Sequence, residues 1–170
     1  PPGVHVPDNR MAARTPSKSH GRLFAIVGGG GLLGLVLLTV VAYIVVNQTV
    51  NGPLQKVIED DPRNKGIEAK AHYGGFGFST LVFDLRDVSG TNSRADVFRV
   101  FLHYAHAMKD KKYDSVELAF RGKTKFVISG TYFKTLGEEF DFQNPVYTIR
   151  TFPENLRTPD GGRAFSVWEG

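Results

Sequence analysis

One uncharged segment near the start of the chain constrains every other interpretation of the sequence. Residues 23–46 contain no Asp, Glu, Lys or Arg, and only Thr39 and Tyr43 among them carry a polar side-chain group. A helix rises about 1.5 Å per residue, so this segment would be about 36 Å long, against about 30 Å for the hydrocarbon core of a bilayer. The sequence therefore predicts a transmembrane helix over residues 23–46.

A cleavable signal peptide is the alternative interpretation of an apolar segment at this position. The apolar region of a signal peptide is about 7–15 residues long and is followed by a small-x-small cleavage site. Here the segment is longer, and Ala42 is followed by Tyr43-Ile44-Val45-Val46. We therefore favour an uncleaved signal anchor.

The charges on either side of the segment predict its orientation. Arg10, Arg14, Lys18 and Arg22 precede it against the single acid Asp8, a charge of +3 on a short tail. Basic residues beside a membrane helix remain on the cytoplasmic side. We expect a disordered cytoplasmic tail (1–22) and an extracytoplasmic C-terminal domain, on the periplasmic side of a bacterial inner membrane. Beyond the anchor, basic and acidic residues are interspersed, which argues against a nucleic-acid partner.

Glycines within the anchor suggest two different structures. Gly29, Gly31 and Gly34 match the spacing of a dinucleotide-binding turn, but the helix after them would be apolar all round and the expected acidic residue is missing. Gly30 and Gly34 instead form a GxxxG pair, which permits close packing of two membrane helices. We expect any homodimer to form through this face, although such spacings also occur without a partner.

The segment 47–66 is expected to be a juxtamembrane linker. Asn51-Gly52-Pro53 should break the helix, and Leu54, Val57 and Ile58 fall at the spacing of a new short helix. Asn47-Gln48-Thr49 matches a glycosylation sequon, but it adjoins the bilayer, where we discount it.

Residues 67–170 are expected to form one small α+β domain. The pattern predicts strands at 67–73, 78–86, 113–121, 125–129 and 146–152, with Gly122-Lys123 as the hairpin turn. Ser93 and Asp96 resemble a capping box that starts a helix extending to about residue 111, and a short helix follows at 131–136. We expect a mostly antiparallel sheet with helices on one face, and the order from residue 78 matches the ferredoxin-like β-α-β-β-α-β unit. The apolar residues before Trp168 suggest that the domain is truncated at its C-terminus, and Met11 resembles a natural start.

The strongest chemical candidates are His103, His106 and Asp110. Their spacing places two imidazoles and a carboxylate on one helix face, where they could bind a metal ion, although His103 and Asp110 would lie about 10 Å apart. An exposed charged face with a His106–Asp110 pair is the simpler interpretation. The acids Glu138, Glu139 and Asp141 could supply a carboxylate pair but are typical of a solvated turn. The chain has no cysteine, so disulfides and thiolate chemistry are excluded.

These features favour a single-pass membrane protein whose exported domain binds or assembles with a protein partner without catalysing a reaction. We predict no cofactor and no metal, and the bilayer itself as a partner. One alternative is a small exported metal-dependent or hydrolytic enzyme that uses His103, His106 and Asp110. A further alternative is a ligand-sensing domain with a deep apolar pocket.

Overall fold

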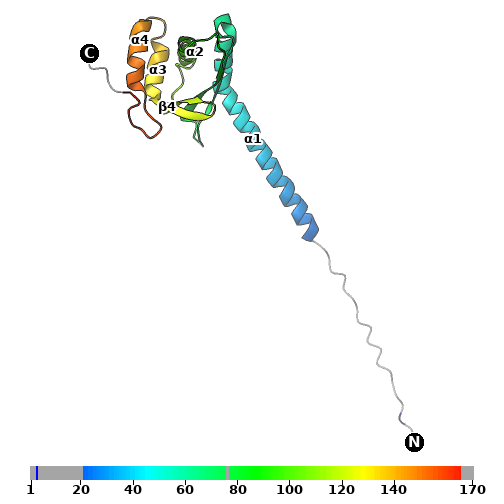
Figure 1. Cartoon of the computed structure of the whole chain (residues 1–170). Helices are drawn as coiled ribbons and strands as arrows, with labels where there is room; N and C mark the ends of the chain where they lie inside the picture. Colours follow the sequence, from blue (N-terminus) through cyan, green and yellow to red (C-terminus); the bar gives the residue numbers. More distant parts are fainter. Residues whose placement is uncertain (1–2, 4–20, 76, 166–170) are drawn as a thin grey trace. The chain divides into compact units, whose positions relative to one another are not determined.

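The computed structural model describes Gly3, residues 21–75 and residues 77–165, with the backbone alone over residues 21–32. Most of the predicted tail (1–22) and the last five residues therefore lie outside the described part. The chain divides into two compact units, Pro1–Val40 and Val41–Gly170, and the second contains the whole sheet (Figure 1). One helix, α1 (Gly21–Asp60), runs from the first unit into the second. Its segment Leu33–Asp60 is, by length and composition, a candidate membrane span.

The expected helix break at Asn51-Gly52-Pro53 is wrong, because α1 continues through Pro53 to Asp60. A proline inside a helix costs about 3 kcal/mol. Val50 and Leu54 lie on either side of the proline and are both fully buried, which contributes about 1.5–3 kcal/mol each. The burial of these two side chains outweighs the local preference for a break. Val50 and Leu54, which were expected in a linker, are thus part of the domain core.

The domain is α+β and is built on a four-stranded mixed sheet. The strands are β1 (Ile67–Tyr73), β2 (Thr80–Val88), β3 (Ser115–Phe120) and β4 (Lys123–Ser129), in the order β1-β2-β3-β4. The outer pairs are antiparallel, and β2 and β3 are parallel because α2 (Arg94–Ala107) crosses over between them. Four of the five predicted strands are therefore present at nearly the predicted places, and the sheet is mixed because of this one crossover.

The predicted fifth strand, residues 146–152, is wrong. This segment forms α4 (Pro145–Thr151), followed by a 3₁₀-helix, η2 (Phe152–Asn155). Asn144 caps α4 by accepting a hydrogen bond from the Val146 N–H at 2.9 Å, and Pro145 occupies the first turn, where its missing N–H costs nothing. Without that strand the ferredoxin-like order is not completed.

Two smaller expectations also need correction. The helix α2 ends at Ala107 rather than near residue 111, although Ser93 and Asp96 form the predicted capping box. The β3–β4 turn consists of Arg121 and Gly122, with φ values of 51° and 78°, rather than Gly122-Lys123. Positive φ at both central residues is the mark of a type I′ hairpin turn. The buried Asp84 of β2 fixes the turn by accepting a hydrogen bond from the Gly122 N–H at 2.9 Å.

The helices pack on one face of the sheet. Alternate strand residues meet α2 there, as in the edge-to-face contact of Phe83 with Phe101, whose ring centroids are 5.3 Å apart. Beside α2 lies α3 (Gly130–Glu138), which also contacts β3 and β4 and contributes the buried Phe133 and Leu136, and α4 lies beside α3 (Figure 1). The aromatic residues near the C-terminus divide accordingly, because Phe133 is in the core while Phe142 and Tyr147 are exposed.

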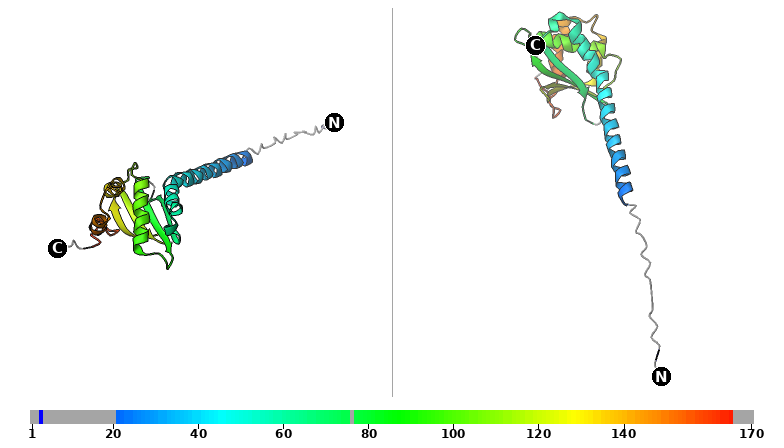
Figure 2. Two further views of the ribbon diagram at one scale, coloured as in Figure 1. Left: turned by 90° about the horizontal axis from the view of Figure 1, so that it is seen from above. Right: turned by 90° about the vertical axis from the view of Figure 1, so that its right-hand side faces the viewer.

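The C-terminal part of α1 runs alongside the edge strand β1 (Figure 2). Three amide side chains on one face of the helix, which we call the amide seam, bond to the backbone of β1. Asn47 Oδ1 accepts from the Tyr73 N–H at 2.8 Å, Asn51 Oδ1 accepts from the Ala71 N–H at 2.9 Å, and Gln55 Nε2 donates to the Ala69 oxygen at 2.8 Å.

The spacing of the amide seam matches the geometry of both elements. Four residues of helix rise about 6 Å and two residues of strand rise about 6.8 Å, so each helical turn meets the next outward backbone group of β1. The order of the pairs shows that α1 and β1 run antiparallel. Tyr104 adds a second attachment, since its buried hydroxyl donates to the Val50 oxygen at 2.9 Å. An edge strand with unpaired backbone groups is a site of unwanted pairing, and the seam covers that edge.

We expect Asn51→Leu to destabilise the domain by about 1–3 kcal/mol, because the Ala71 N–H would lose its partner beside a bulkier apolar side chain. Amide hydrogen exchange should show faster exchange at Ala71. The neighbouring exposed Gln48 provides the control, and Gln48→Leu should leave the exchange of Ala71 unchanged. Equal protection of the Ala71 amide in both variants would contradict the hydrogen bond between Ala71 and Asn51.

A second prediction concerns Gly137 in α3, whose added Cβ would lie 2.3 Å from the Ala105 oxygen of α2. Replacing a glycine inside a helix by alanine ordinarily stabilises it by about 1 kcal/mol. For Gly137→Ala we expect the opposite sign, a lower melting temperature, because the backbones of α2 and α3 would have to separate. Gly52→Ala in α1, where the Cβ meets open space, should not lower it. A melting temperature for Gly137→Ala at or above that of Gly52→Ala would show that the close approach is not needed.

Candidate functional site

The three residues that were weighed as weak candidates for a metal site do not converge. His103 and His106 lie on α2, but Asp110 follows the end of that helix, and no hydrogen bond or ion pair of its side chain occurs among the described residues. The carboxylate nearest to His106 belongs to Asp141, with 3.9 Å between Nε2 and Oδ2. Within the part of the chain that the structure describes, no three His, Asp or Glu side chains are placed to hold one metal ion.

The two histidines instead attach the segment after α3 to α2. The Phe140 ring lies between them, with centroid distances of 4.7 Å to His103 and 4.9 Å to His106. His106 Nδ1 is 3.0 Å from the Gly137 oxygen, which assigns the proton to Nδ1. Burial, and then the nearby Arg99, lower the pKa of His103, so its ring is neutral at pH 7. A neutral imidazole packed on an aromatic ring is a packing contact.

The acids of the α3–α4 region do not form a carboxylate pair either. Glu138 pairs with Lys134, and Glu139 accepts a hydrogen bond from the Gln143 amide at 3.1 Å. Asp141 is exposed beside His106. Each acid therefore faces a different partner, whereas acid–base catalysis by two carboxylates requires both to face one substrate.

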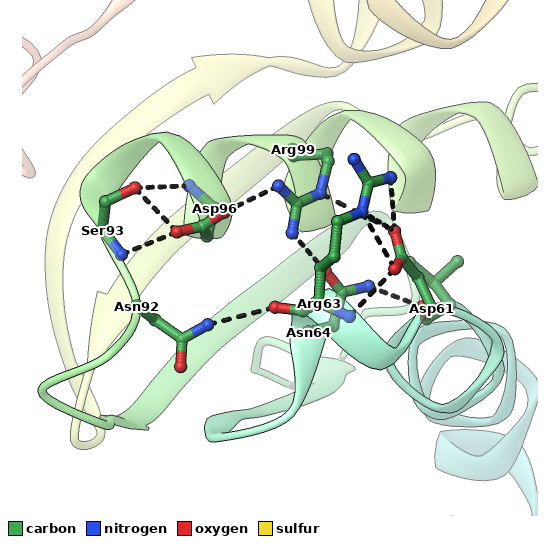
Figure 3. A network of polar contacts seen from close by, with 8 residues as sticks. Asp61, Arg63, Asn64, Asn92, Ser93, Asp96 and Arg99 are labelled. Carbon is green, nitrogen blue, oxygen red and sulfur yellow. Dashed lines mark hydrogen bonds and ion pairs between the residues drawn. The ribbon is translucent and has the colours of Figure 1, made fainter.

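A polar network joins the end of α1 to the start of α2 (Figure 3). Asp61 binds Arg63 at 2.7 Å, and Asp96 binds Arg99 at 2.6 Å. The buried Asn64, in the 3₁₀-helix η1 (Pro62–Asn64), accepts from Arg99 at 2.9 Å and donates to the Val57 oxygen of α1 at 3.0 Å. The network thus fixes the far end of α1 against α2.

The carboxylates of this network are unsuited to proton transfer. The side-chain hydrogen bond from Arg63 lowers the pKa of Asp61 to about 2. The backbone and hydroxyl of Ser93, followed by Arg99, lower the pKa of Asp96 to about 2. A general base works best with a pKa near the operating pH, so two such weak bases are structural groups. The sequence had shown the capping box, but not that Arg99 joins it to Asn64.

A groove of about 370 Å³ lies beside the amide seam. It is lined by Asn51, Gln55, Ile67, Glu68, Ala69, Lys70 and Arg86. Five of these seven residues are polar or charged, and the charges have both signs. Small-molecule sites are mostly apolar concavities with a few convergent polar groups. This groove therefore differs from the deep apolar pocket expected of a ligand sensor.

The most conspicuous surface feature of the domain is apolar. Phe142 in the α3–α4 loop is 76% exposed, and Val146, Tyr147 and Ile149 of α4 are each more than half exposed. We call these four residues the α4 patch. The buried side chain of α4 is Thr148, so the helix presents its apolar residues outward. The strand interpretation obscured this patch, although Asn144-Pro145 is a helix-start signal that could have revealed it.

The chain was compared with protein-family models, with curated proteins and with solved structures, and none of the three comparisons found a match.

Proposed function

We propose that the protein is a single-pass membrane protein whose domain binds a protein partner in or beside the bilayer, through the α4 patch, without catalysing a reaction. The observation that carries this proposal is the exposure of the four apolar residues of the α4 patch, three on α4 and one in the loop before it. Large apolar side chains gathered on a surface mark an interaction site. Aromatic residues and arginine are enriched in protein interfaces, and the α4 patch combines Phe142 and Tyr147 with the adjacent exposed Arg150.

The construction of the domain supports a role at the membrane. The helix that contains the candidate span also supplies Val50 and Leu54 to the core and the amide seam to β1. A domain on a flexible tether would not need its anchor for folding. Here the helix that contains the candidate span is part of the fold, so membrane attachment and folding of the domain involve the same element.

The charge distribution supports an N-terminus in the cytoplasm and an extracytoplasmic domain, which we propose to lie on the periplasmic side of a bacterial inner membrane. Four basic residues precede the uncharged segment against one acidic residue. If two copies associate through the anchor, the GxxxG pair provides the contact. An added Cβ at Gly34 meets open space, while the side-chain surroundings of Gly30 lie outside the described residues.

The topology can be tested directly because the chain has no cysteine. We expect a cysteine introduced at Gly90, in the β2–α2 loop, to react in intact spheroplasts with a maleimide that cannot cross the membrane. A cysteine at Ser17 in the tail should react only after lysis. The reverse pattern would contradict the proposed orientation.

Partner binding can be tested with a photo-crosslinking amino acid at Tyr147, and at the exposed Lys125 of β4 as the control. We expect one defined adduct from position 147 that is absent from position 125. Ile149→Ser should remove the adduct while leaving the melting temperature unchanged, because Ile149 is exposed. The same adduct from both positions, an adduct with a second copy of the chain, or an adduct insensitive to Ile149→Ser would overturn the assignment of the α4 patch.

A further inference from the structure

Within the second compact unit, the amide seam determines which end of the sheet lies beside Asn47, where the uncharged segment ends. From Gln55 through Asn51 to Asn47, the helix leads back toward its apolar residues, and the bonded groups of β1 advance from Ala69 to Tyr73. Tyr73 therefore lies beside Asn47, the first residue after the uncharged segment 23–46. The described residues of the β1–β2 loop, 74–75 and 77–79, lie at this same end of the sheet, between Tyr73 and the start of β2.

This loop presents an aromatic side chain. Phe78 is 60% exposed, and its ring stands edge-on to the Tyr73 ring with 5.1 Å between centroids. The loop is closed at its base, where the Gly74 N–H donates to the Thr80 oxygen at 2.9 Å, and Gly75 makes the turn with a φ of 65°. A short closed loop supported by Tyr73 holds Phe78 outward at little additional entropic cost.

Basic side chains lie at the same end of the domain. The α2–β3 loop, residues 108–114, enters the sheet beside the β1–β2 loop because β2 and β3 are parallel, and the Asp114 N–H donates to the Ser79 oxygen at 2.8 Å. Lys111 and Lys112 in this loop are both exposed. Phe78 and the two lysines thus lie at the same end of the sheet as Tyr73 and Asn47.

We propose that this end of the domain rests on the bilayer that holds α1, with Phe78 in the interface and Lys111 and Lys112 against anionic lipid headgroups. Aromatic side chains concentrate at the level of the headgroups, and a lysine near an anionic surface contributes about 1 kcal/mol. Tyr43, which is 53% exposed one turn before Asn47, would lie at the same interface. The bilayer is the occupant that the helix itself brings to this surface, so no encounter with a separate partner is required.

The proposal rests on the membrane insertion of α1, which is part of the proposed function, but it does not depend on the α4 patch. The β1–β2 loop lies near Asp114, whose oxygen accepts from the Gly130 N–H at the start of α3. The α4 patch begins with Phe142, after the end of α3. Contact with lipid at one end of α3 leaves the other end available to a protein.

The test uses the full-length protein in nanodiscs containing phosphatidylglycerol, with one environment-sensitive fluorophore on an introduced cysteine. Ser79→Cys places the label in the β1–β2 loop, and Gly90→Cys places it at the opposite end of β2, where an added Cβ meets open space. Leu37→Cys labels the apolar segment of α1. For positions 79 and 90, the lipid quencher has a nitroxide near its headgroup. For position 37, the nitroxide lies deeper, on the lipid acyl chain. Quenching by each lipid is compared with quenching by aqueous iodide.

We expect the lipid quencher to act several-fold more strongly at position 79 than at position 90, and iodide to show the reverse order. Phe78→Ser should reduce lipid quenching at position 79, whereas Phe142→Ser, which removes another exposed phenylalanine, should not. Lys111→Glu combined with Lys112→Glu should reduce lipid quenching at position 79 in nanodiscs with phosphatidylglycerol. The same double variant should leave this quenching unchanged in nanodiscs of phosphatidylcholine.

This proposal alone would be overturned if iodide quenched positions 79 and 90 equally while the lipid quencher still acted at position 37. Absence of lipid quenching at position 37 would overturn the membrane anchor and this proposal together. Shielding of position 79 from iodide in dilute detergent would show that protein rather than lipid covers the loop, which also overturns the proposal.

Discussion

The amide seam between α1 and β1 is the contact on which the rest of the domain depends. It joins a helix to an edge strand through side-chain amides, which can accept from and donate to backbone groups that a neighbouring strand would otherwise satisfy. The same helical segment places Val50 and Leu54 against α2 and the sheet. The seam also sets a direction, because it places the β1–β2 loop beside the end of the apolar segment. The proposal that the β1–β2 loop rests on the bilayer follows from this arrangement.

The sequence predicted the elements that depend on local signals. The alternation of Ile67–Tyr73, the capping box of Ser93 with Asp96, and the glycine at the β3–β4 turn were each sufficient to locate a strand, a helix start and a hairpin. The errors occurred where a distant contact decided the outcome. Pro53 is tolerated because Val50 and Leu54 are buried in the core, and neither burial can be read from the residues around the proline. In the hairpin, Asp84 of a different strand holds the Gly122 N–H.

The candidate site shows the same division between local and distant signals. The spacing of His103 and His106 correctly placed both on α2, but their common partner is Phe140, which lies more than thirty residues away in sequence. The spacing of Asn47, Asn51 and Gln55 is visible in the sequence. The three side chains share one helix face only if the helix continues past Pro53, which the sequence did not predict. The α4 patch could have been recognised from Asn144-Pro145, which starts a helix at least as readily as it precedes a strand.

Two fragments of the chain would show whether the end of α1 is a structural part of the domain. We expect the fragment 47–170 to unfold cooperatively in urea and to protect the amides of β1 and β2 from hydrogen exchange. The fragment 61–170, which lacks the amide seam together with Val50 and Leu54, should show neither property. If the fragment 61–170 unfolds cooperatively at the same urea midpoint as the fragment 47–170, the end of α1 is not a structural part of the domain.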